Sequence, residues 1–310
     1  MAVPGYLRDH HIGPLTVLPA VEALQILARS KPAAWDAESR LQEGVLFHHL
    51  LAIDPAAAEM SLLQEHERYA DGSCLSRLTT IRRRGTVSRR MEHLLVRFVP
   101  AAPGSAEGNA APPPGDSGPD DAVAGRMAPA ASADAGRISD RAFGFPGLSL
   151  TFFDTGPTDG AAFRVGGSRL YQELVPFGPA YRNIRGDVWL TPEGAWATVS
   201  GGNFPEAEGP LGSPFPFDAA MHAACAWGQR YGNRVVFPVA FDRREIFRPT
   251  RTAQTYLCRI SPRPGEGSSL CFDLWICDRD QRPAEAVRGL RMREIPGGKL
   301  TPPAWVREGV

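Results

Sequence analysis

The sequence has few cysteines, and none of them stand close together. Five occur in 310 residues, an odd number, and none of them form a Cys-x-x-Cys pair. This pattern argues against a disulfide framework and against a thiolate metal site of the usual spacing. It favours a reducing cytoplasmic compartment, in which the thiols are packing residues. The cysteines are Cys74, Cys225, Cys258, Cys271 and Cys277.

Long apolar runs and an excess of charge are also missing. No stretch approaches the ~20 apolar residues of a membrane-spanning helix, and no basic segment followed by an apolar core opens the chain. Lys plus Arg equal Asp plus Glu at 34 each, so the net charge suggests no nucleic-acid partner. The 43% hydrophobic content is ordinary for a globular protein. We therefore expect a soluble cytoplasmic protein without membrane or nucleic-acid binding.

One short segment is strongly basic despite this balance. Residues 81–90 read Ile-Arg-Arg-Arg-Gly-Thr-Val-Ser-Arg-Arg. The simpler interpretation is a solvated hairpin tip, and the alternative is a docking patch for an acidic partner.

Several catalytic and binding motifs are absent. The sequence has no Gly-rich phosphate loop of Rossmann or P-loop spacing, no Gly-x-Ser-x-Gly and no His/Cys cluster with metal-ligand spacing. We therefore predict no metal site.

The composition divides the chain into two parts. Between residues 101 and 140 it shifts to Ala, Pro, Gly, Ser and Asp, which predicts a disordered linker. On this reading residues 1–100 and 141–310 form an N-terminal and a C-terminal half. Each half shows a helical pattern, at 19–28 and 217–231, followed by extended stretches with short connections, which favours antiparallel sheets. The predicted strands are 45–53, 59–69, 76–84 and 88–99, then 235–246, 252–260, 268–277 and 284–295.

The first candidate for chemistry is a pair of imidazoles ahead of the first helix. His10 and His11 precede an apolar segment that begins at Pro19. In an extended chain neighbouring side chains point to opposite sides, so only one of the two can face a given cavity. Either both are loop histidines, or one acts as a general base, since burial and a nearby helix start favour the neutral imidazole.

A carboxylate and an imidazole open the second helix. Asp218 and His222 are four residues apart, so they share a helix face and can bind each other or one ligand. Asp218 either caps the helix, or it lies in an apolar pocket and serves as a proton donor.

Two further segments are of interest. Two prolines and a glycine in 175–182 predict a rigid bend before a strand, which is either a plain turn or the wall of a narrow channel. His48 and His49 fall inside a predicted strand, so we interpret them as structural.

Taken together, these motifs resemble those of the dehydratase domains of modular polyketide synthases. His10 and Pro19 stand at the separation of that family's His-x-x-x-Gly-x-x-x-x-Pro motif, and Asp218 and His222 match its Asp-x-x-x-Gln/His motif. Residues 177–181 resemble its Tyr-Gly-Pro-x-Phe motif. The stretches similar to its Leu-Pro strand motif and its closing hairpin are 237–240 and 274–291.

The resemblance implies an α+β double hotdog fold, in which each half wraps an antiparallel sheet around one long central helix. The site would lie at the junction of the halves, with His10 as general base, Asp218 as general acid and His222 sharing the proton of Asp218. A backbone amide at the start of the first helix would stabilise charge on the substrate's thioester oxygen. The residues implied to contact substrate are Gly13, Pro19, Phe177, Gly178, Pro179 and Tyr181.

The implied reaction converts a 3-hydroxyacyl thioester on an acyl carrier protein to the 2-enoyl thioester. The substrate is carried on phosphopantetheine, and no metal or other cofactor is expected. The implied partners are the acyl carrier protein and other synthase components, and the resemblance alone suggests a homodimer.

Two departures from the family motifs keep alternatives open. Pro14 occupies the Gly position of the first motif, and Phe177 replaces the tyrosine of the third. One alternative is a non-catalytic hotdog module that binds an acyl carrier protein or scaffolds a synthase. Another is a double hotdog cyclase or isomerase.

Overall fold

The computed structural model describes residues 1–32, 35, 39–100, 162–265, 267–294 and 300–309, with the side chain of residue 84 excepted. All of them fall in one structural unit, made of Met1–Ala101 and Thr155–Val310. The linker predicted at 101–140 lies outside the described residues and stays a prediction, as does the division into halves at its ends.

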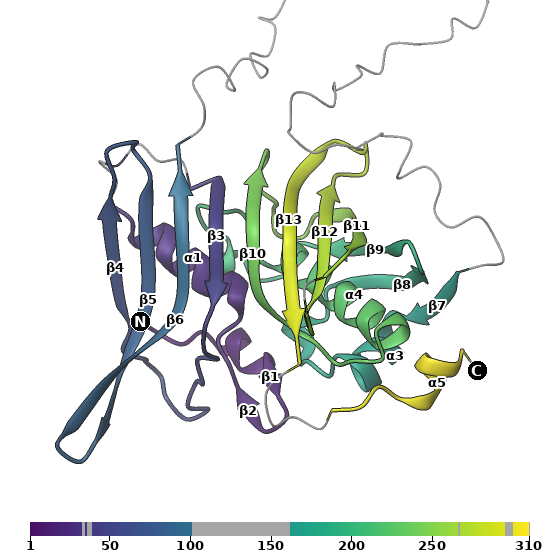
Figure 1. Cartoon of the computed structure of the whole chain (residues 1–310), viewed down its shortest axis with the longest axis horizontal. Coiled ribbons are helices and arrows are strands. Elements are labelled where there is room, and N and C mark those ends of the chain that lie inside the picture. Colours follow the sequence, from purple (N-terminus) through teal and green to yellow (C-terminus); the bar gives the residue numbers. More distant parts are fainter. Residues whose placement is uncertain (33–34, 36–38, 101–161, 266, 295–299, 310) are drawn as a thin grey trace, which may run out of the picture. The chain divides into compact units, whose positions relative to one another are not determined.

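A single antiparallel sheet of eleven strands organises the described chain (Figure 1). Its strands in the first hundred residues are β3 (Leu41–Phe47), β4 (Leu63–Arg68), β5 (Cys74–Arg84) and β6 (Val87–Val99). Those after residue 161 are β7 (Phe163–Gly166), β8 (Ile184–Thr191), β9 (Gly194–Ser200), β10 (Phe237–Ile246), β11 (Thr255–Arg263), β12 (Leu270–Cys277) and β13 (Pro283–Arg293). The spatial order is β4-β5-β6-β3-β10-β13-β12-β11-β9-β8-β7, so β3 and β10 join the two expected sheets edge to edge.

Two longer helices lie against this sheet. Helix α1 (Ala20–Ser30) packs on β5 and β6, and α4 (Phe215–Tyr231) packs mainly on β9, β11 and β12. Prolines at the helix starts suit these positions, because the first turn of a helix does not use their missing N–H groups. The arrangement, one helix against each part of the antiparallel sheet, is the one expected from the sequence.

Short elements complete the chain. They are a two-stranded sheet of β1 (His11–Ile12) and β2 (Leu15–Thr16), the helices α3 (Gly167–Arg169) and α5 (Ala304–Glu308), a π-helical turn at Leu170–Leu174, and 3-10 turns at Gly5–Asp9, Pro179–Tyr181 and Pro205–Ala207.

The predicted strand at 45–53 is partly wrong, because β3 ends at Phe47. The residues that follow pair with the segment before α1 instead of continuing the strand. Leu18 donates its N–H to the carbonyl of Leu51 at 2.8 Å, and Ile53 donates to the carbonyl of Thr16 at 2.8 Å. Of the apolar residues in 48–53, Leu51 and Ile53 are buried beside the segment before α1. Strands β7 and β9 are absent from the predicted set, whereas β8 is the strand expected after the bend.

Candidate active site

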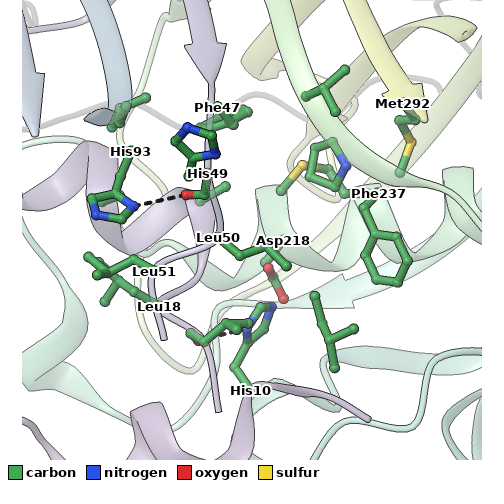
Figure 2. A pocket seen from close by; sticks show the side chains of 18 of the residues that line it. His10, Leu18, Phe47, His49, Leu50, Leu51, His93, Asp218, Phe237 and Met292 are labelled. Atoms are coloured by element: carbon green, nitrogen blue, oxygen red, sulfur yellow. Dashed lines mark hydrogen bonds between the residues drawn. The ribbon is translucent and has the colours of Figure 1, made fainter. Parts of the chain in front are cut away.

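A cavity of about 550 Å³ receives the side chains of His10, Asp218 and His222 together (Figure 2). His10 comes from the segment before α1, and the other two from the first turns of α4. Most of the other lining residues are apolar and come from both parts of the sheet. They include Val17, Leu18, Phe47, Leu51, Leu78, Leu94, Val175, Met221, Phe237 and Met292. The sequence-derived expectation that one site draws on both helix starts agrees with this placement.

The His10 ring is held by its own segment. Its Nδ1 lies 3.0 Å from the carbonyl oxygen of Val17, and a carbonyl only accepts, so Nδ1 carries the proton of the neutral ring. The other nitrogen, Nε2, is then unprotonated. Burial lowers the pKa of His10 to about 4, although the nearby Asp218 carboxyl acts in the opposite direction. His10 is therefore a neutral base at neutral pH, and Figure 2 shows the Asp218 carboxyl pointing toward its ring.

A tight hairpin creates this arrangement and explains Pro14. Strands β1 and β2 pair His11 with Thr16 and Ile12 with Leu15, so Gly13 and Pro14 form a two-residue loop. Gly13 has a φ of +57°, as the first position of a type II′ loop requires, and the negative φ of proline suits the second. Pro14 therefore lies at the hairpin tip, where its missing N–H removes no pairing bond. The hairpin returns Val17 to the side of His10.

Asp218 and His222 form a close buried pair. The Nε2 atom of His222 lies 3.0 Å from Oδ2 of Asp218, and their side chains are 6% and 4% exposed. The alignment is not that of a hydrogen bond, and neither atom has another hydrogen-bond partner among the described residues. Buried polar atoms without partners are costly, so both are poised to bind a small polar group entering the cavity.

The capping interpretation of Asp218 does not fit the structure. Helix α4 begins at Phe215, so Asp218 is the fourth residue of the helix and not the residue before it. The residue at the N-cap position is Pro214, and no side chain caps this helix end.

Tyr171 orients the His222 ring from behind. Its hydroxyl oxygen accepts the N–H of Ile184 at 3.0 Å and lies 3.3 Å from Nδ1 of His222. Burial raises the pKa of Tyr171, so the phenol keeps its proton and can donate it to Nδ1. The remaining proton of a neutral His222 then sits on Nε2, facing Asp218. Tyr171 lies in the π-helical turn and has no counterpart among the sequence-derived candidates.

Phe177 stands between the two imidazoles. Its ring stacks on His10 with centroids 4.3 Å apart and contacts His222 at 4.9 Å. It also lines the cavity. In place of the tyrosine of the family motif, this residue supplies an apolar ring that packs against both imidazoles.

The other five residues implied to contact substrate do not line the cavity. Tyr181 packs edge-on against His10 at 5.0 Å, and Gly13 lies at the hairpin tip. Pro19 occupies the position before α1 and accepts hydrogen bonds through its carbonyl. These three residues lie behind the residues that line the cavity, and so do Gly178 and Pro179.

Asp9 fastens the bend at 177–181 to the His10 segment. Its carbonyl accepts the N–H of Gly178 at 2.7 Å, and its carboxylate accepts the N–H of Ala180 at 2.8 Å. A Cβ on Gly178 would lie 2.6 Å from the Asp9 carboxyl, so this close approach requires glycine. The bend is thus the clamp that holds Phe177 against His10.

Three histidines that line the cavity were misinterpreted or missed. His48 and His49 follow β3 and line the cavity, so their interpretation as strand residues is wrong. His93 of β6 also lines it and is absent from the sequence-derived candidates. Nδ1 of His93 donates to the carbonyl of His49 at 3.0 Å, and Thr80 lies 2.8 Å from Nε2 (Figure 2). Only the pairing of β3 with β6 brings these residues together.

Within the described residues, no group of three or more His, Cys, Asp or Glu side chains could hold a metal ion. Across the same residues, no helix is long and apolar enough to cross a membrane.

Sequence comparison finds one similar family. Residues 157–302 match the profile described as "Polyketide synthase dehydratase N-terminal domain". The matched residues are similar to those of polyketide synthase dehydratase domains. The match supports a dehydratase-type, lyase activity in polyketide synthesis. A comparison with curated protein sequences finds no match.

Solved dehydratase domains share the fold. A trans-AT polyketide synthase dehydratase domain from Brevibacillus brevis is similar with a TM-score of 0.63 and 16% identity, over 94% of this chain and 90% of that one. The dehydratase domain of PpsC from Mycobacterium tuberculosis, in complex with C12:1-CoA, gives 0.60 and 17%, over 95% and 91%. A bifunctional dehydratase-cyclase domain in ambruticin biosynthesis gives 0.57 and 18%, over 93% and 86%. The predicted double hotdog fold is thereby confirmed.

Proposed function

We propose that this site dehydrates a 3-hydroxyacyl thioester, carried on the phosphopantetheine arm of an acyl carrier protein, to the 2-enoyl thioester and water. The observation that carries the proposal is the placement of a neutral His10 and the buried Asp218–His222 pair on one largely apolar cavity. An acid and a base on opposite sides of a bound chain are the equipment that β-elimination needs.

His10 would remove the α-proton of the substrate through Nε2. Its Nδ1–H bond to Val17 fixes the tautomer and aligns the ring before substrate enters. Burial favours the neutral form, so no proton has to be lost first at neutral pH.

Asp218 would protonate the departing β-hydroxyl. The C–O bond breaks as the proton moves from the carboxyl to the hydroxyl oxygen, which leaves as water. His222 would hold that oxygen through its Nε2–H, because this atom and Oδ2 of Asp218 are both buried and without a hydrogen-bond partner, in residues that line the cavity. The proton gained by His10 then returns to the Asp218 carboxylate and completes the cycle.

The first turn of α1 would stabilise charge on the thioester oxygen. No side chain caps this helix end, and Ala20 lines the cavity. Free N–H groups of a first helical turn suit a developing negative charge. The reaction transfers only protons and hydroxide, so the proposal includes no metal or redox cofactor.

The test is turnover of a 3-hydroxyacyl pantetheine thioester, followed by mass spectrometry as loss of water. We expect His10→Ala and Asp218→Asn each to lower kcat by about 10²- to 10⁴-fold, the usual worth of one acid or base. His11→Ala is the matched control, because His11 is the adjacent imidazole but does not line the cavity. It should keep turnover within a few-fold of the wild-type value, and circular dichroism checks the fold of each variant.

Unchanged turnover in both the His10 and Asp218 variants would rule out these roles. A wild-type protein that binds the carrier without dehydrating any acyl chain would support the non-catalytic module instead. A cyclised product would support the cyclase alternative, which gains interest because one similar structure is a bifunctional dehydratase-cyclase. The carrier partner, the homodimer and the cytoplasmic location stay predictions.

A further inference from the structure

The hairpin of β5 and β6 carries two arginines that face each other without a counter-charge. Arg82 and Arg89 are directly opposite in the strand register, and both are exposed. Like charges directly opposite destabilise a strand pair. Within the part of the chain that the structure describes, neither arginine forms an ion pair, whereas neighbouring Arg77 and Arg90 are paired with glutamates. Figure 1 shows this hairpin extending past the ends of the strands beside it.

The same hairpin leads into the cavity of the candidate active site. Residues Val87 to Arg90 are exposed, Met91 is half-buried, and His93 and Leu94 are buried. The last three line the cavity, so β6 runs from solvent into the cavity wall.

The two arginines lie on the cavity face of the hairpin. Side chains two residues apart on a strand share a face, which puts Arg89 with Met91. On β5, Arg82 likewise shares a face with Thr80, whose hydroxyl contacts the ring of His93. The charge of Arg82 also contributes to lowering the pKa of His93, after the larger effect of burial. One step of two residues, about 7 Å along the strand, separates the arginine pair from the cavity lining.

We propose that Arg82 and Arg89 together bind the phosphate of the phosphopantetheine arm while its acyl end occupies the cavity. This inference rests on the proposed function, because it assumes a substrate delivered on that arm. The arm carries its phosphate at the end remote from the thioester, and a phosphate is the compact anion that two facing guanidinium groups bind well. The bound phosphate would also neutralise the repulsion between the arginines.

Two thioesters of the same 3-hydroxyacyl group test the proposal, one on phosphopantetheine and one on pantetheine, which lacks the phosphate. We expect wild-type protein to show about tenfold lower KM for the phosphorylated substrate at low salt, with similar kcat, since the contact is made equally in the ground and transition states. The R82Q/R89Q double variant should lose this preference to within about twofold. Raising the salt concentration should reduce the wild-type preference.

The matched control is R83Q, because Arg83 pairs with Ser88 and points to the other face of the same hairpin. It should keep the wild-type preference. Equal preference in wild type and the double variant would overturn the inference. So would a double variant impaired only on the intact acyl carrier protein, which would indicate contact with the carrier's own surface. The coenzyme A thioester, which has further phosphates, shows whether these add to the effect.

Calorimetry of phosphopantetheine and pantetheine binding, without turnover, distinguishes failure of the proposed dehydration from failure of the proposed phosphate site. If wild type dehydrates neither thioester, the proposed function fails. The phosphate site then still stands if phosphopantetheine binds wild type at least several-fold more tightly than it binds the double variant, and it falls if the two bind equally.

Discussion

The two central helices are anchored in different ways. Helix α1 reaches across to the C-terminal part of the chain, because Gln25 bonds to the backbone of Leu211 and Gly212 and Arg29 to the carbonyls of Ala207 and Glu208. Helix α4 is anchored within its own part, where Gln229 donates to the Leu174 carbonyl and Trp227 to that of Thr191.

The difference has a consequence for the candidate site. The segment that carries His10 depends on contacts with the C-terminal part, through Asp9 and through α1. The hydrogen bonds given above for α4, by contrast, all come from its own part of the chain. Substitutions that destabilise the C-terminal part should therefore displace both His10 and the Asp218–His222 pair. Substitutions that remove the α1 hydrogen bonds should displace His10 alone.

The largest effect is expected from the buried ion pair under α4. Arg244 and Glu285 are 2% and 0% exposed, their closest atoms are 2.6 Å apart, and the guanidinium lies over the ring of Phe217 in α4. Glu285→Ala leaves a buried charge without its partner, so we expect the free energy of unfolding to fall by about 3–5 kcal/mol. Urea denaturation measures it. Asp280→Ala, which removes a partner from the exposed Arg282 pair, is the control and should change stability by about 1 kcal/mol or less. If Glu285→Ala lowers the free energy of unfolding no more than the control does, the buried ion pair does not stabilise the part of the chain that holds α4.

The next effect is a pH dependence that belongs to the N-terminal part. The pKa of His10 is lowered from 6.5 to about 4, so its contribution to stability is lost as pH falls from about 6.5 to 4. The pKa of Glu22 in α1 is raised from 4.5 to about 8, mainly by burial, so stability is lost as pH rises from about 4.5 to 8. Each full shift corresponds to about 3–5 kcal/mol at ~1.4 kcal/mol per pKa unit.

Because the two effects oppose each other between about pH 4.5 and 6.5, single variants reveal them. Stability of Glu22→Gln, measured by denaturation from pH 4 to 8, should rise with pH up to about 6.5 relative to wild type. In His10→Asn, the free energy of unfolding should fall continuously as pH rises from about 4.5 to 8, because only the effect of Glu22 remains. Parallel pH curves for both variants and wild type would show that neither group is held as described.

The smallest effect sharpens the comparison most. Gln25→Ala removes two buried hydrogen bonds between α1 and the 211–212 segment, which should cost about 1–3 kcal/mol. Amide hydrogen exchange should then show faster exchange in α1 while α4 keeps its protection. Gln64→Ala on exposed β4 is the same chemical change without these bonds and serves as control. Equal loss of protection in both helices would mean that α1 and α4 unfold together.

Much of the fold was predictable because it depends on local pattern. The helices are found within two residues of their predicted starts, and seven of the eight predicted strands match a strand over most of the strand's length. The failure at 48–53 has a physical reason: Leu51 and Ile53 are buried and bond to the segment before α1, and alternating burial alone does not distinguish a strand from a covered loop. Strand β7 is short and pairs with β8 alone, and β9 lies between β8 and β11, so both are defined by their partner strands.

For the candidate site, the sequence by itself determined the candidates for acid–base chemistry, His10, Asp218 and His222. The separation of His10 from Pro19 and of Asp218 from His222 are local spacings, readable without a structure. The tertiary structure alone decided what surrounds them: Val17 against Nδ1 of His10, Tyr171 behind His222, Phe177 between the imidazoles, and His93 with the β6 hairpin at the cavity wall. These contacts depend on chain closure by turns, on strand register and on the joining of β3 to β10, which bring together residues up to about two hundred positions apart and leave no periodic trace in the sequence.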